Sequence, residues 1–147
     1  MALFRIDRRT ELSCAEAWRR LTDWPRHSGS VPLTRITVAT PPPTGVGTVF
    51  VARTGIGRLA FEDPMEVVVW EPPQAQRLPG HCRMEKRGRL VIGWAEIEVR
   101  PDPSGTGARL VWREELRVRG LPRALDPLVA PAGRLVFGRA LTVLLKS

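Results

Sequence analysis

The chain has 147 residues, 43% of them hydrophobic, which is enough for one domain, residues 1–147, with a core of its own. No run of about 18 apolar residues predicts a membrane span, and the charged start MALFRIDRRTELS differs from a signal peptide, so we expect a cytoplasmic protein. The net charge of +8 comes from arginines spread beside acidic residues, without a nucleic-acid-binding motif, so we expect neither a nucleic-acid partner nor membrane insertion.

The N-terminal part predicts a strand followed by two short helices. Residues 3–12 alternate between apolar and polar side chains, as in a strand with one buried face. Residues 13–23 then predict a helix, because Ser13 can cap it and Glu16, three residues later, completes a capping box. Residues 24–29 form a second helical turn, with a proline near its start.

Six further strands follow, separated by short polar turns that indicate mostly antiparallel pairing. Pro64 interrupts the long segment 58–70 and predicts an edge position or a bulge there, because proline cannot donate a hydrogen bond to a neighbouring strand. The predicted strands cover residues 33–40, 46–54, 58–70, 77–88, 89–100 and 109–120.

The last segment, residues 121–147, returns to the spacing of a helix. Apolar residues recur at threes and fours, and Leu135 belongs to this stripe. We expect a short turn first and a main helix that begins near Pro131, since proline suits a first helical turn. The helix is so apolar that much of its circumference should be covered.

One residue departs from the pattern of the final strand. In RLVWREELRVRG, residues 109–120, Leu110, Trp112 and Leu116 share the buried side, and Glu114 lies in the same register. A lone buried carboxylate is costly, so three outcomes are open. Glu114 pairs with an arginine, either Arg8 or Arg35; it stays protonated with a raised pKa; or a bulge turns it outward.

The order of elements resembles the helix-grip fold of the START-like, or Bet v 1-like, superfamily, also called SRPBCC, and within it the polyketide cyclase/dehydrase and lipid-transport group. The segments that carry the resemblance are TELSCAEAWRRLTDWPRHSGSVP, VWEPPQAQRL, PDPSGTGARLVWREEL and the C-terminal helix. The resemblance implies an α+β fold in which a curved antiparallel sheet of about seven strands holds a long C-terminal helix over a hydrophobic cavity. It supplies no catalytic motif, because members bind lipids, hormones or polyketides and only some are enzymes.

Three classes of function therefore stay open. The first is binding of one small, largely apolar, lipid- or polyketide-like molecule in the cavity. The second is an enzyme of the polyketide aromatase/cyclase type that uses polar residues in the cavity. The third is a protein-interaction module similar to the co-chaperone members, which needs an exposed apolar patch and little cavity. The oligomeric state, monomer or homodimer, is also open.

The candidate ligand-binding residues share an expected position on the buried side of the sheet, at the cavity opening or on the long helix. Glu114 is also the one catalytic candidate. The two cysteines and two histidines have no ligand spacing, so we expect no metal site and no cofactor. The candidates are Trp24, Cys82, Met84, Gly93, Ala95, Trp112, Glu114 and Leu135.

Overall fold

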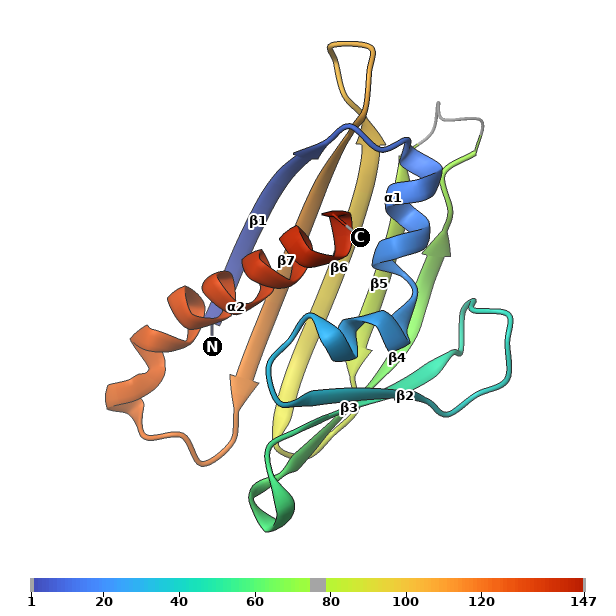
Figure 1. The fold of residues 1–147 in the computed structure, drawn as a ribbon. Helices are drawn as coiled ribbons and strands as arrows, with labels where there is room; N and C mark the ends of the chain where they lie inside the picture. Colours follow the sequence, from blue (N-terminus) through green and yellow to red (C-terminus); the bar gives the residue numbers. More distant parts are fainter. Residues whose placement is uncertain (1, 75–78, 147) are drawn as a thin grey trace.

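The computed structural model describes residues 2–74 and 79–146, and within these ranges seven strands form one antiparallel sheet (Figure 1). The strand order is β1-β7-β6-β5-β4-β3-β2, so β1 and β2 are the edges. The strands are β1 (Ala2–Thr10), β2 (Thr34–Val38), β3 (Val49–Thr54), β4 (Phe61–Glu71), β5 (Gly80–Lys86), β6 (Val91–Pro101) and β7 (Ala108–Val118). The expected start of the fifth strand, at residues 77 and 78, lies outside the described residues.

The two short helices after β1 and the long C-terminal helix lie on the inner face of the curved sheet (Figure 1). The described residues contain two α-helices, α1 (Cys14–Leu21) and α2 (Asp126–Lys146), and the short 3₁₀ helices η1 (Trp24–Gly29), η2 (Gly57–Leu59) and η3 (Arg123–Leu125). The predicted α+β helix-grip arrangement, with two short helices after β1 and a long helix at the end, is confirmed.

Local sequence explains these elements. In β5 every second residue is buried, so its polar neighbours lie on the outer face. At α1, the Ser13 hydroxyl accepts a hydrogen bond from the Glu16 backbone N–H at 3.1 Å. Only this half of the predicted capping box forms, because the Glu16 carboxylate instead pairs with Arg19 and Arg20.

The prediction of an edge position or a bulge at Pro64 was wrong. Strand β4 lies inside the sheet, between β3 and β5, and it continues through Pro64, which pairs with Val51. The register shift falls between Val67 and Val69 instead. The Pro64 carbonyl accepts a hydrogen bond from the Arg87 N–H at 2.8 Å, which ties the end of β5 to this strand.

Helix α2 differs from the prediction in its start and in its burial. It begins at Asp126, with Pro127 in its first turn, and Pro131 lies inside it. Residues 123–146 are long and apolar enough to cross a membrane by length and composition, yet only 22% of the apolar window is buried. The expectation that much of its circumference is covered was therefore wrong.

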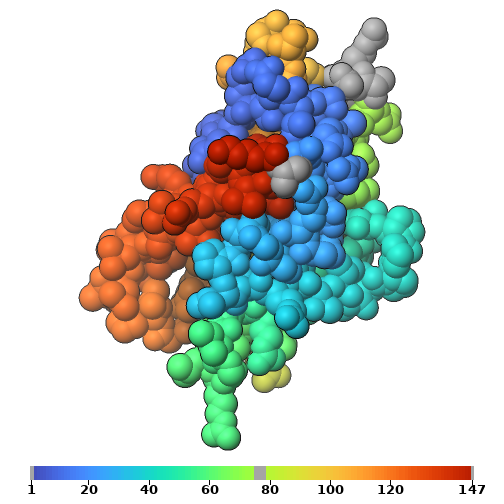
Figure 2. Space-filling model, in the orientation of Figure 1, coloured from blue at the N-terminus to red at the C-terminus, as the bar shows by residue number. Residues whose placement is uncertain are grey.

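The reason is that only the C-terminal half of α2 packs closely on the domain. Its buried residues are Gly138, Ala140, Leu141 and Leu144, and this helix packs against β1 and α1. Further toward the N-terminus, a Cβ atom added at Gly133 would lie 2.5 Å from the Phe4 ring. The glycine therefore lets the helix pass directly over this ring. Beyond that point the helix stands off the sheet, and Figure 2 shows the surface hollowed beneath it.

Candidate functional site

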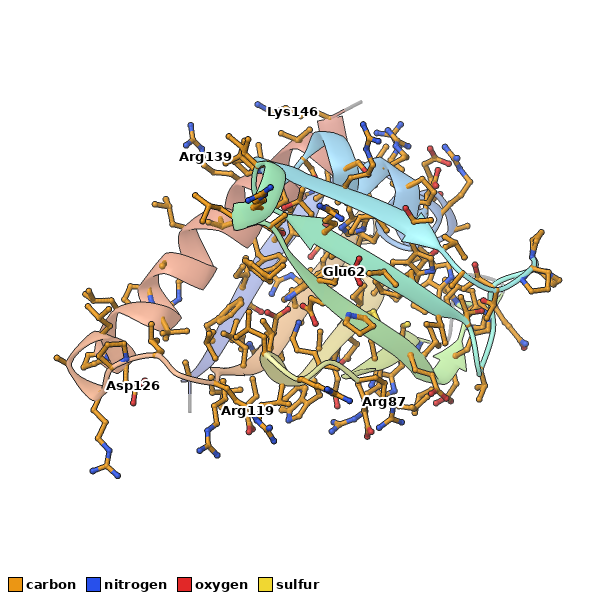
Figure 3. The ribbon with its side chains drawn as sticks, turned by 90° about the horizontal axis from the view of Figure 1, so that it is seen from below. Glu62, Arg87, Arg119, Asp126, Arg139 and Lys146 are labelled. Carbon is orange, nitrogen blue, oxygen red and sulfur yellow. The ribbon has the colours of Figure 1, made fainter. Side chains whose placement is uncertain are left out.

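A cavity of about 220 Å³ lies between the inner face of the sheet, η1 and α2. Every strand except β1 contributes to its lining, together with η1 and Phe137 of α2. Most of the lining is apolar. Figure 3 looks onto the end of the sheet where β3 and β4 meet, and side chains from the strands fill the space up to α2.

Aromatic rings form one wall of the cavity. The Trp24 ring stacks on Phe50 with centroids 4.4 Å apart, and Trp112 stacks on Phe137 at 5.4 Å. His27 lies between these pairs, 5.9 Å from Trp24 and 6.1 Å from Trp112. The His27 Nε2 lies 2.8 Å from the Leu21 carbonyl, and burial lowers the pKa of His27, so its ring is neutral. The wall is therefore flat, apolar and uncharged.

Besides His27, three ionisable side chains interrupt the apolar lining, and each comes from a different strand. Asp63 of β4 accepts a hydrogen bond from the Lys86 ammonium of β5 at 2.7 Å. Glu114 of β7 is 1% exposed and faces the same cavity. Ala95 of β6 pairs with Glu114, and its small side chain leaves room between the carboxyl group and β5.

The electrostatic environment favours a protonated Glu114. Burial raises the pKa of Glu114; the Lys86 ammonium counteracts part of the rise, and the Asp63 carboxylate adds to it. Burial also raises the pKa of Asp63, against the effect of Lys86. For Lys86, burial lowers the pKa, but the negative charges of Asp63 and of ionised Glu114 outweigh it, so the pKa is raised. With Lys86 and Asp63 charged, a proton on Glu114 would make the group neutral, and burial favours that form of Glu114.

The polar atoms of this site lack partners. The buried side-chain nitrogen and oxygen atoms that make no hydrogen bond within the described residues are Trp24 Nε1, Asp63 Oδ1, Trp112 Nε1 and both carboxyl oxygens of Glu114. All four residues line the same cavity. The Trp112 indole is near enough to favour the charged form of Glu114 slightly, but its N–H forms no hydrogen bond of acceptable geometry. Buried polar groups without partners are rare in folded proteins, so the occurrence of four such residues in the lining of one cavity indicates a candidate site.

Five of the eight predicted site residues lie together in the lining: Trp24, Met84, Ala95, Trp112 and Glu114. Glu114 is on the cavity side, and of the three outcomes considered for it, a raised pKa agrees with the structure. The outcome in which Glu114 pairs with Arg8 or Arg35 does not agree with the structure. Arg8 and Arg35 are both exposed, and the Arg8 guanidinium donates to the Asp7 carbonyl at 3.0 Å.

The other three residues lie outside the lining, each for a different reason. Cys82 is buried, but it pairs with Trp70 and Ile97 in the part of the sheet that α1 covers. Gly93 has φ 134°, and a Cβ atom there would meet the Glu115 carbonyl oxygen at 1.9 Å, so this glycine permits a close backbone approach. Leu135 is 65% exposed, on the outer side of α2.

Five lining residues that give the site its charge and its aromatic wall were not among the predicted ones. Three carried a readable signal, because Lys86 shares the buried register of Met84, Asp63 shares that of Met65, and Phe50 shares that of Ala52. The other two, His27 and Phe137, had no such signal. Among the described residues, no group of three His, Cys, Asp or Glu side chains is arranged to hold a metal ion.

No protein-family model and no curated protein matches the sequence. Among solved structures, the crystal structure of Ara h 8.0201 aligns with a TM-score of 0.64 at 10% sequence identity, over 99% of this chain and 98% of that chain. The crystal structure of TTHA0849 from Thermus thermophilus aligns with a TM-score of 0.69 at 12% identity, over 97% and 93% of the two chains. At such identities the likeness concerns the fold alone. The chain has the Bet v 1-like helix-grip fold that its sequence predicts.

Proposed function

We propose that this protein binds one small, largely apolar molecule in the cavity, with a polar group of the molecule against Glu114. The observation that carries the proposal is that all the unpartnered buried polar side-chain atoms of the described residues belong to four residues that line one apolar cavity. Binding sites for small molecules combine apolar walls with a few polar groups that orient the ligand. The ligand is lipid- or polyketide-like, and both buried, free cysteines suit the reducing cytoplasm that we propose as its location.

The protonation state of the site indicates which polar group fits. A neutral Glu114 donates one hydrogen bond through its O–H, and the indoles of Trp24 and Trp112 offer two further N–H donors. Asp63 Oδ1 is an acceptor at the same site. Donors outnumber acceptors, so the ligand presents a carbonyl or similar oxygen, and its flat body stacks along the aromatic wall.

The first experiment tests occupancy of the cavity. Native mass spectrometry of the purified protein should detect a bound small molecule, and the dye 8-anilinonaphthalene-1-sulfonate should bind the folded protein with a stoichiometry near one. Ala95→Trp, which fills the cavity, should weaken dye binding. Ala39→Trp, at an exposed position outside the lining, is the matched control and should leave it unchanged. Dye binding that appears only on partial unfolding would refute the proposal.

A second experiment tests the polar anchor. Acetylnaphthalene and isopropenylnaphthalene have nearly the same shape, but only the first carries a carbonyl oxygen. In competition with the dye, the native protein should prefer the ketone by about 2- to 10-fold, the range of one net hydrogen bond. Glu114→Leu should abolish this preference while it retains binding of the alkene. Compared near pH 4.5, where ionisation of Glu114 does not yet lower the stability of the native protein, Glu114→Gln should change ligand affinity more than it changes stability. An equal preference in the native protein and in Glu114→Leu would contradict the assignment of Glu114.

Acid–base catalysis on the bound molecule is the second candidate function, of the polyketide aromatase/cyclase type. The specific observation in its favour is that one cavity holds a carboxylic acid, Glu114, and a carboxylate with a free oxygen, Asp63. In a dehydration, Asp63 would remove the proton next to a ketone while Glu114 protonates the departing hydroxyl, so that water and an enone form. An aromatic β-hydroxy ketone assayed by absorbance tests this, and Glu114→Gln and Asp63→Asn should each abolish turnover. The interaction-module alternative is disfavoured, because it needs little cavity.

A further inference from the structure

Exposed apolar side chains gather at one end of the domain. This end is formed by the turn before β2, the β3–β4 hairpin with η2, the β5–β6 turn, and the segment from β7 through η3 into α2 (Figure 1). Of eleven exposed large hydrophobic side chains in the described residues, seven lie here, and Leu59 is 88% exposed. The seven, which we call the apolar rim, are Leu33, Ile56, Leu59, Phe61, Leu90, Leu125 and Leu128.

Backbone contacts hold the rim in place. The Gly55 N–H donates to the Leu33 carbonyl at 2.9 Å, and the Arg119 N–H donates to the Leu90 carbonyl at 2.8 Å. Leu33 itself has φ 56°, an unfavourable conformation for a leucine, and its side chain is 64% exposed. Phe61 belongs to the rim and also lines the cavity, so the rim adjoins the candidate site.

The same end carries positive charge that is not neutralised within the protein. Among the described residues, none of the six arginines around the rim forms an ion pair, whereas nine arginines elsewhere or at its margin do. Two acidic residues, Glu62 and Asp126, lie among them (Figure 3). The arginines are dispersed in sequence but gathered in space. They are Arg53, Arg58, Arg89, Arg117, Arg119 and Arg123.

Three of these arginines share one groove. Arg117, Arg119 and Arg123 line a surface depression between the end of β7 and the start of α2, together with Asp126. All three are exposed, and Figure 3 shows Arg119 directed away from the domain. A groove with three guanidinium groups is suited to phosphate oxygens, which guanidinium groups bind in bidentate geometry.

We propose that this end of the domain docks on an anionic lipid surface, with the apolar rim at the acyl boundary and the arginines at the headgroup phosphates. Apolar side chains combined with nearby basic residues are the features by which proteins bind such surfaces reversibly. A second copy of this chain is a poorer occupant, because a symmetric contact would bring the unneutralised arginines of both copies together. In the docked orientation the cavity opens toward the bilayer, so an apolar ligand enters or leaves without crossing water.

The test is co-sedimentation with vesicles in the absence of added ligand. The native protein should bind vesicles of phosphatidylcholine with phosphatidylglycerol, bind pure phosphatidylcholine weakly, and dissociate as salt increases. Leu59→Ser should weaken binding by about five- to tenfold. Its matched control is Val46→Ser, which removes another exposed side chain from the β2–β3 loop and should have no effect.

A second pair of variants tests the charges. Arg119→Gln with Arg123→Gln should weaken vesicle binding by about 25-fold, since each arginine at an anionic surface contributes about fivefold. Arg5→Gln with Arg19→Gln makes the same change in net charge away from the rim and should change binding far less. Unfolding midpoints confirm that each variant is folded.

Three results would overturn the proposal. One is the absence of any preference for anionic vesicles, and another is equal weakening by the rim variants and their controls. The third is a dimer, detected by light scattering, that Leu59→Ser converts to monomers, since a second copy would then occupy the rim. None of these results bears on dye binding in solution, so the cavity proposal is tested separately.

Discussion

Replacement of Glu114 by glutamine should make stability less sensitive to pH. Glutamine resembles the neutral acid in shape and cannot ionise, so Glu114→Gln retains the favoured state of the site. The wild-type side chain is buried without a hydrogen-bond partner, and this burial raises its pKa above the value of 4.5 for a free side chain. The unfolded chain ionises at that lower value.

The sign and size of the effect follow from proton linkage. Because the folded pKa is raised, the contribution of Glu114 to stability is fully present below pH 4.5 and is lost as pH rises through the folded pKa. Between the unfolded and the folded pKa, the wild-type free energy of unfolding should fall, relative to that of Glu114→Gln, by about 1.4 kcal/mol per pH unit. Two pH units inside the interval therefore separate the two proteins by about 3 kcal/mol.

Urea unfolding of both proteins at successive pH values above 4.5 measures this difference, because the loss begins where the unfolded chain ionises. Titrations shared by the two proteins largely cancel, so the difference isolates Glu114. Glu62→Gln, at an exposed position on β4, is the matched control for the removal of one carboxylate from the same protein. A difference for Glu114→Gln that stays constant with pH would show that Glu114 is ionised in the folded protein, and the assignment of a neutral acid to the cavity would fail.

Three further predictions concern other buried groups. Lys86→Met should destabilise the fold by about 3–5 kcal/mol, because it leaves the Asp63 carboxylate unpaired, and Asp63→Asn in the same chain should restore much of the loss in urea unfolding. Burial raises the pKa of Cys82 to about 12, so a thiol reagent at about pH 8 should modify this residue only after unfolding. The Ser104 hydroxyl and two arginines hold the pKa of Asp102 well below the ordinary value of 3.8. The contribution of Asp102 to stability is therefore present above pH 3.8 and is lost as pH falls through the folded pKa. Asp102→Asn should therefore flatten the acid limb of the stability curve, as measured by circular dichroism.

The sequence predicts the sheet and the short helices well because those elements depend on local patterns. The alternation in β5 and β7 sets which side chains face the core, and Ser13 sets the start of α1. The same alternation placed Glu114, Trp112 and Met84 on the cavity side, since register alone decides that face.

The errors concern features that depend on tertiary position. Helical spacing gives an apolar stripe to α2, but it does not say which side of the helix faces the sheet, and Leu135 lies on the outer side. The small size of Gly93 suggested space in the cavity, whereas its positive φ serves a backbone contact. His27 and Phe137 come from separate elements and meet Trp112 only when η1 and α2 close over the sheet. Such contacts have no local signal.

The buried charges themselves argue that the cavity is kept for a purpose other than stability. Three apolar residues of similar volume at positions 63, 86 and 114 would avoid the desolvation of two carboxyl groups and an ammonium, and such replacements often stabilise proteins. The three residues come from β4, β5 and β7, so no single turn or cap requires them. Only Lys86 and Asp63 bond to each other, and neither carboxyl oxygen of Glu114 has a hydrogen-bond partner within the described residues. A purely structural ion pair would need no Glu114. We therefore expect that Glu114→Leu is more stable than the native protein at neutral pH and that it loses the preference for a carbonyl-bearing ligand. A Glu114→Leu protein that is both less stable and equally selective would contradict this view of the site.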